Sequence, residues 1–319
     1  MNIKIKIKIL FVLLMIPLAG IIAQQDAQYT QWMFNKLSIN PAYAASSDYA
    51  CISCLHRSQW VGLEGAPVSQ SLNLRVPLYK KNVGLGLSIN HDQIGPTNSW
   101  QFSGIYAYRF NFENQHKLSV GLQGSVRSYR VKYSETEALE SGDGLLPTAD
   151  QNRMIPNFGV GLYYYTPKFF VGLSAPRLLE GDLSFFKDGS NNTDFAREEL
   201  HGFLMAGAVF ELNDAIKLKP SLLFKYVKDA PFDADLHASL IFYDIFWAGL
   251  TYRLGGIGNS GGESLDMVLQ LQLSRAIRLG FAYDFTLSKV REYSDGTFEV
   301  VLDYCLNPGN DRLTNPRFF

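Results

Sequence analysis

The stretch SLDMVLQLQLS (264–274), followed after one residue by AIRLGFAYDFTLS (276–288), alternates between apolar and polar side chains. One face carries Leu269, Leu271, Phe281 and Phe285, and the other carries Gln270, Gln272 and Asp284. A period of two residues indicates β-strands with two different faces. The runs are longer than ordinary strands and match the ~9–11 residues that a tilted strand needs to cross a bilayer. They therefore predict transmembrane strands with the apolar face toward lipid.

The same period recurs along the chain, for example in NVGLGLSIN (82–90) and SWQFSGIYAYRF (99–110). It predicts fourteen strands, at 50–61, 68–77, 82–92, 98–111, 116–131, 156–165, 168–175, 201–213, 215–228, 235–243, 245–254, 264–274, 276–288 and 297–306. Hydrocarbon offers backbone groups no hydrogen-bond partner, so the strands must close into a barrel without edges. The predicted fold is all-β, a transmembrane antiparallel β-barrel.

The predicted connections differ between the two ends of the barrel. Those after even-numbered strands are short, whereas several after odd-numbered strands are long, including 132–155 and 176–200. Outer-membrane barrels have short periplasmic turns and longer extracellular loops. Apolar pairs in exposed loops either fold over the lumen or meet a partner. Leu145, Leu146, Phe185 and Phe186 are therefore candidate extracellular partner contacts.

The first 23 residues have the features of a secretory signal peptide. A basic leader precedes a short apolar core and small residues, with cleavage expected near Ala23. The expected organisation is a signal peptide at 1–23, a lead-in or plug segment at 24–49, a barrel at 50–306 and a C-terminal tail at 307–319. The formal net charge of −1 provides no basic surface for nucleic acid. The predicted location is the outer membrane, with the lipid bilayer as one partner.

The three cysteines raise the question of a disulfide. Cys51 and Cys54 fall on opposite faces of the first predicted strand, about 10 Å apart, so they cannot bridge each other. Cys305 lies on the last strand, which must pair with the first. Its pairing with Cys51 or with Cys54 stays open at this point.

The sequence offers no recognisable set of residues for metal binding or catalysis. The five histidines are dispersed, and no second CxxC completes a zinc site. The glycine-rich run at 255–262 lacks the Lys-Ser/Thr of a phosphate-binding loop. We therefore predict no catalytic residues, no metal and no cofactor, and expect the protein not to be an enzyme.

The stretch QYTQWMFNKLSINPAYAAS (28–46) follows neither the strand nor the helix period. The simplest interpretation is a non-regular lead-in that packs against the fold. Burying a Phe-sized side chain stabilises by roughly 1.5–3 kcal/mol, so its aromatic residues should dock in the lumen or against the periplasmic rim. We favour the lumen, which is too wide in a fourteen-stranded barrel for wall side chains alone to fill. The plug candidates are Trp32, Met33, Phe34, Asn40, Pro41 and Tyr43. Because the stretch precedes the first strand, we expect it to begin on the periplasmic side.

Residues 29–46, YTQWMFNKLSINPAYAAS, resemble the opening signature of the PorP/SprF family of type IX secretion system outer-membrane proteins. HRSQWVGLEGAPVSQSLNLRVPL from His56, NVGLGLSINHDQIGPT from Asn82, YYYTPKFFVGLSAPRLL from Tyr163 and the terminal NPRFF resemble the family as well. Ala44-Ala45-Ser46 departs from the Ala-Gly-Ser expected in the family.

The resemblance implies a barrel that helps to deliver or retain secreted cargo at the cell surface. It further implies recognition of a cargo C-terminal domain, contacts with periplasmic secretion-machinery components and, in some members, a role in gliding motility. The alternative function is that of an outer-membrane porin or hydrophobic-solute channel with an N-terminal plug.

Overall fold

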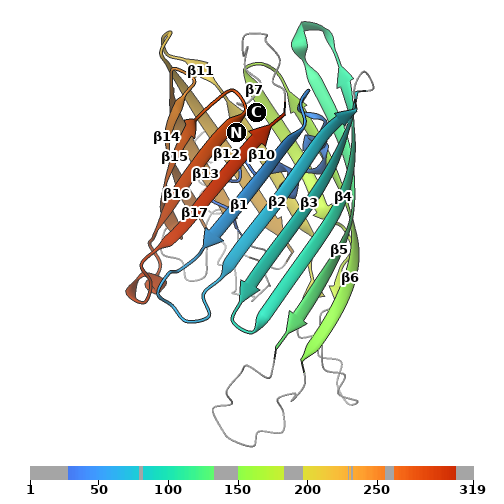
Figure 1. The fold of residues 1–319 in the computed structure, drawn as a ribbon, viewed down its shortest axis with the longest axis vertical. Helices are drawn as coiled ribbons and strands as arrows, with labels where there is room; N and C mark the ends of the chain where they lie inside the picture. The colour runs from blue at the N-terminus through green and yellow to red at the C-terminus, as the bar shows by residue number, and fades with distance from the viewer. Residues whose placement is uncertain are drawn as a thin grey trace, which may run out of the picture.

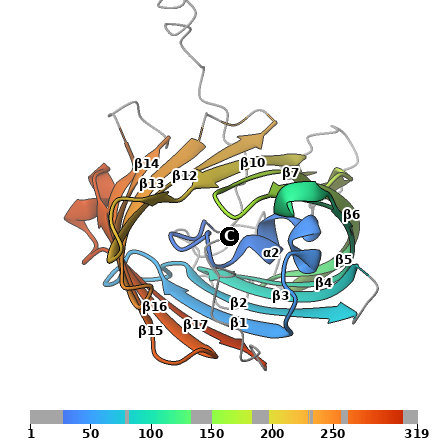
Figure 2. The same cartoon turned by 90° about the horizontal axis from the view of Figure 1, so that it is seen from above.

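The computed structural model describes residues 28–78, 82–132, 150–182, 197–228, 230, 233–255 and 262–306. Within these residues, antiparallel strands form one sheet that closes on itself as a barrel. Figure 1 shows the barrel from the side, with its strands tilted, and Figure 2 shows it along its axis.

Fourteen strands make the barrel wall in the described part of the chain, with β10 and β11 counted as one strand. Their bounds are β1 (Cys51–Ser58), β2 (Val68–Leu78), β3 (Val83–Ile94), β4 (Thr97–Asn111), β5 (Lys117–Val131), β6 (Gln151–Tyr165), β7 (Phe169–Arg177), β10 (His201–Ala208), β11 (Phe210–Glu211), β12 (Ile216–Val227), β13 (Asp233–Phe242), β14 (Phe246–Leu254), β15 (Ser264–Gln272), β16 (Ile277–Thr286) and β17 (Thr297–Cys305). Two short strands outside the wall, β8 (Gly181–Asp182) and β9 (Arg197–Glu198), pair with each other. The fourteen-stranded barrel predicted from the alternation is confirmed.

The barrel closes where the first strand pairs with the last. Cys51 and Cys305 lie directly opposite each other in the β1–β17 ladder, with their Cα atoms 4.0 Å apart, and they form a disulfide. Cys54 pairs in register with Leu302, is exposed and is free. The register therefore selects Cys51 as the partner of Cys305.

The two faces of the wall have the predicted polarity. Leu271, Phe281 and Phe285 are exposed on the outer face, whereas Gln270 and Asp284 are buried in the lumen. An apolar outer band around a polar interior is typical of barrels that cross the outer membrane. Within the described residues, no helix has the length and apolarity that crossing a membrane requires.

The predicted strand at 201–213 is interrupted at Val209, which separates β10 from β11. The interruption faces Lys219 and Pro220 of β12, between the pairs Gly207–Ser221 and Phe210–Leu218. Proline has no N–H to donate, so the ladder breaks locally. The Val209 N–H donates to the Lys168 carbonyl, on the β7 side of the strand, at 2.8 Å.

The connections are short at one end of the barrel, the upper end in Figure 1. At the opposite end, longer connections occur at 59–67, 132–150, 178–200 and 287–296, although β3 and β4 are joined there by Gly95 and Pro96 alone. Short turns face the periplasm in barrels of this kind. We call the two ends periplasmic and extracellular accordingly.

Four short helices accompany the wall in the described residues. The helix α2 (Lys36–Ile39) and the 3₁₀-helix η1 (Pro41–Ala45) lie inside the ring of strands, as Figure 2 shows. The 3₁₀-helices η2 (Glu113–Gln115) and η4 (Lys289–Glu292) belong to connections between strands. The core of the molecule therefore includes a segment from outside the sheet.

Candidate functional site: the lumenal segment

Residues 28–49, which we call the lumenal segment, run through the barrel from one end to the other. At the extracellular end, the Gln28 amide donates to Asp233 at the start of β13, at 2.5 Å. At the periplasmic end, Asp48 pairs with Arg109 of β4 at 2.6 Å and with Lys117 of β5 at 3.9 Å. The expectation that the stretch begins on the periplasmic side is wrong, because its first described residue lies at the extracellular end.

Glycines on the inner face of the wall let the segment approach the sheet directly. A Cβ added at Gly84 would overlap the Ala44 carbonyl, and one at Gly121 would overlap the Ala42 nitrogen. Glycine is the residue that permits such a close approach of two backbones. At these glycines, η1 therefore packs directly against the backbone of the wall.

A buried cluster of charged side chains anchors the start of the segment. The Glu299 carboxylate accepts the backbone N–H groups of Thr30 at 2.9 Å and Gln31 at 2.7 Å. The Thr30 hydroxyl donates to Asp284, and Arg57 pairs with Asp284 at 2.8 Å and Glu299 at 3.2 Å. Hydrogen bonds to charged partners are stronger than neutral ones. The cluster therefore holds the segment at a defined depth.

Aromatic contacts fix the middle of the segment. Trp32 is fully buried, and the Phe34 ring lies 4.4 Å from the Arg278 guanidinium and 5.9 Å from the Trp247 ring. The Arg contact has cation–π geometry. Removing these rings would empty a large part of the lumen.

Lys36 lies in an aromatic cage. Its Nζ lies 4.2 Å from the centre of the Phe170 ring, 5.1 Å from that of Tyr43 and 5.8 Å from that of Tyr163. The Tyr163 hydroxyl is 3.4 Å from the same Nζ. The faces of aromatic rings attract an ammonium group, which accounts for a lysine at this buried position.

The predicted break at Asn40 and Pro41 lies where α2 ends and η1 begins. The Asn40 side-chain oxygen accepts the Ala42 N–H at 2.9 Å and so caps η1, while its amide donates to the Leu162 carbonyl at 2.9 Å. Proline at the first position of a helix costs no hydrogen bond. The turn is therefore tied to the wall through β6.

The structure brings the six plug candidates together in the lumen, where Trp32, Met33, Asn40, Pro41 and Tyr43 are buried and Phe34 is half-buried. Whether they close the lumen to solutes stays a prediction. The candidate contacts Leu145, Leu146, Phe185 and Phe186 lie outside the described residues, as do the signal peptide at 1–23 and the tail at 307–319. Sequence reasoning missed the anchor of Arg57, Asp284 and Glu299. Charged residues on inward strand positions were the available signal.

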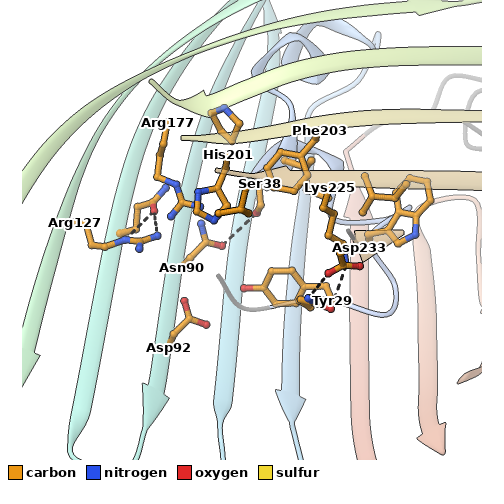
Figure 3. Close-up of a pocket in the computed structure, with 17 residues that line it drawn as sticks. Tyr29, Ser38, Asn90, Asp92, Arg127, Arg177, His201, Phe203, Lys225 and Asp233 are labelled. Atoms are coloured by element: carbon orange, nitrogen blue, oxygen red, sulfur yellow. Dashed lines mark hydrogen bonds and ion pairs between the residues drawn. The ribbon is translucent and has the colours of Figure 1, made fainter. Parts of the chain in front are cut away.

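A cavity lies on the extracellular side of the lumenal segment, and we call it the outer cavity (Figure 3). It encloses about 890 Å³ including its open mouth, and Tyr29, Trp32, Ser38 and Ile39 of the lumenal segment line it. Wall residues from the extracellular halves of several strands complete the lining, among them Asp92, Arg127, Phe203, Lys225 and Asp233. In the part of the chain that the structure describes, no group of three or more His, Cys, Asp or Glu residues could hold a metal ion.

Comparison with known protein families shows to which family the chain belongs. A model described as type IX secretion system membrane protein PorP/SprF matches residues 21–304. This chain belongs to the PorP/SprF family. The PorP/SprF resemblance noted in the sequence is thereby confirmed, and the location of this barrel is the outer membrane. No curated protein matches the chain.

Solved structures similar to this PorP/SprF protein are outer-membrane barrels. The CymD monoaromatic hydrocarbon channel is 15% identical, with 92% of this chain and 96% of CymD covered and a TM-score of 0.51. A Pseudomonas aeruginosa FadL homologue is 14% identical, with 86% and 93% covered and a TM-score of 0.49. Acinetobacter baumannii Omp33 is 10% identical, with 81% and 98% covered and a TM-score of 0.46. Identities this low establish the fold alone, because one fold hosts many functions.

Proposed function

We propose that this PorP/SprF protein helps to deliver or retain a secreted cargo protein at the cell surface as a component of the type IX secretion system. The observation that carries the proposal is the occupied lumen, in which the chain's own residues 28–49 pack from the extracellular to the periplasmic end. A barrel filled in this way acts through its two mouths and its outer surface. Membership of the family supplies the secretion context.

Two partners follow from this function. The extracellular mouth receives the C-terminal domain of the cargo, with Leu145, Leu146, Phe185 and Phe186 as candidate contacts. The periplasmic rim, where Asp48 meets Arg109, faces components of the secretion machinery. A contribution to gliding motility fits a surface adhesin as cargo. The proposal includes no catalytic step.

An outer-membrane porin or hydrophobic-solute channel is the alternative. A pore of either kind needs a continuous path for the solute. In the described residues, buried side chains of the lumenal segment such as Trp32 and Met33 occupy the lumen, and we expect them to interrupt this path. We therefore favour the secretion function.

The test compares cells that lack the protein with cells that carry the parent or a variant with residues 180–196 deleted. Cargo is measured by immunoblotting of whole cells and culture medium, after surface proteolysis. We expect deletion of the gene to move cargo from the cell surface to the medium. The loop deletion should do the same while the barrel still assembles, because residues 180–196 belong to the connection between the extracellular ends of β7 and β10. Unchanged surface cargo in the gene deletion would contradict the proposed function.

A further inference from the structure

The outer cavity lies in the extracellular half of the lumen. Its lining comes from the extracellular ends of the strands, including Arg177 at the end of β7, His201 at the start of β10 and Asp233 at the start of β13. The lumenal segment separates it from the periplasmic end, where Asp48 is bound. A molecule in the outer cavity therefore arrives from outside the cell.

Buried polar atoms in the lining that lack a hydrogen-bond partner among the described residues include the indole Nε1 of Trp32, which is a donor, and one carboxylate oxygen of Asp92, which is an acceptor. Figure 3 shows Asp92 projecting into the cavity without a dashed contact to the other labelled residues. Buried polar groups are nearly always paired, so such atoms indicate a missing partner. The missing partner must both accept and donate hydrogen bonds.

The remaining lining combines apolar and polar side chains. Ile39, Phe203 and Leu223 provide apolar contacts. Charged side chains of the lining have protein partners. Lys225 pairs with Asp233 at 3.3 Å, and the Arg127 guanidinium donates to the side-chain oxygen Oε1 of Gln101 at 2.7 Å. The cavity therefore does not present a cluster of cations built for an anion.

We propose that the outer cavity binds an extended polypeptide segment of the secreted partner, an inference that rests on the proposed function. A peptide group supplies a carbonyl oxygen for the Trp32 N–H and an N–H for the Asp92 carboxylate. An apolar side chain of the segment packs against Phe203 and Leu223.

The apolar lining distinguishes a peptide from a glycan. Sugars also donate and accept hydrogen bonds and stack on aromatic rings such as Tyr29. The aliphatic side chains Ile39, Leu223 and Val227 offer a sugar no comparable contact, whereas they suit the side chain of an apolar amino acid. A peptide segment uses both parts of the lining.

The experiment uses the purified full-length barrel in detergent micelles. The probe is a pool of hexapeptides with blocked ends, and retained peptides are measured by mass spectrometry after equilibrium dialysis. We expect retention of peptides with a large apolar residue. Trp32→Phe and Asp92→Asn should each weaken retention on the order of fivefold, which corresponds to one ordinary hydrogen bond. Trp247→Phe is the matched control, because Trp247 is buried in the lumen without lining the outer cavity, and it should leave retention unchanged.

Three outcomes would overturn the site. They are no retained peptide, equal retention by the parent and both cavity variants, or retention of maltohexaose or inorganic phosphate in place of peptides. Heat-dependent gel migration of each variant verifies that its barrel is folded. If gene deletion releases cargo but no peptide binds, the site is wrong and the proposed function stands. If gene deletion leaves cargo in place, the proposed function fails whatever the peptides do.

Discussion

At the scale of single residues, the lumenal segment depends on wall positions that carry no side chain. Gly121 lies against the Ala42 nitrogen, whereas Gly104 and Gly124 face open space on the outer surface. The same residue type thus has two different roles on one sheet. A substitution at one position of each kind distinguishes the two roles.

Gly121→Val should displace η1 from the wall and leave the barrel folded, because the strand ladder and the outer face are unchanged. Forcing extra methyl groups into a packed site costs about 1–3 kcal/mol. Limited proteolysis of the purified protein should then cut within residues 28–49. Gly124→Val is the control and should stay resistant, since nothing lies within 4 Å of its added Cβ. Equal resistance of both variants would show that the segment does not need a glycine at position 121.

The buried anchor is the second residue-scale feature. Arg57→Met removes the cation that lies closest to the carboxylates of Asp284 and Glu299, and breaking a buried pair in this way costs ~3–5 kcal/mol. We expect a marked decrease in the melting temperature, measured by circular dichroism in detergent. Arg130→Met is the comparison, because the Arg130–Asp150 pair of 2.8 Å is half exposed and such pairs contribute only about 0–1 kcal/mol. Similar melting temperatures for both variants would argue against the anchor.

At the scale of the element, the lumenal segment has a direction. Gln28 lies near Asp233 and Lys225 at the extracellular end, and Asp48 lies near Arg109 at the periplasmic end. The chain therefore passes through the whole lumen before it enters β1. The two ends of this short segment face different compartments.

Cysteine labelling tests this direction. In a Cys54→Ala background, Gln28→Cys should react with a membrane-impermeant maleimide on intact cells, because it lies beside the outer cavity. Asp48→Cys should react only after the outer membrane is opened. Gel-shift detection of the labelled protein measures both reactions. Labelling of Asp48→Cys alone on intact cells would reverse the assigned orientation.

At the scale of the whole molecule, a wide barrel is filled by its own chain. Trp32, Met33, Leu37 and Tyr43 belong to one buried cluster with wall residues such as Tyr163. Polar wall groups satisfy the segment's backbone, as at Ser174, whose hydroxyl donates to the Ile39 carbonyl at 2.9 Å. The filled lumen is the physical basis for preferring the secretion function to a pore.

Planar-bilayer recording tests the closed lumen. The parent should show no steady conductance, and a Trp32→Ala/Phe34→Ala double variant should conduct, because each truncation removes a large lumenal side chain at a cost of about 3–5 kcal/mol. A Trp100→Ala/Phe102→Ala variant is the matched control, since these rings are exposed on the outer face. If the double variant is as closed and as heat-stable as the parent, the two rings do not close the lumen.

The alternation of side chains was enough to predict the barrel, because alternation is a local property that each strand carries within its own residues. The sequence set the number of strands, the lipid-facing side of β15 and β16, and the family through the run at 29–46. It also marked Asn40 and Pro41 as a turn, since proline restricts its neighbours wherever it stands.

The contacts inside the lumen could not be predicted from local patterns. Arg57, Asp284 and Glu299 are far apart in the chain, and they come together with Thr30 because the sheet closes between β1 and β17. The same closure determined that Cys305 forms its disulfide with Cys51. The pairing of cysteines on two strands depends on the strand register, which the alternation of side chains does not fix. The path of the lumenal segment likewise depends on contacts with distant strands. Local sequence patterns therefore predicted the strands of the wall, whereas long-range packing determined how the lumenal segment lies inside it.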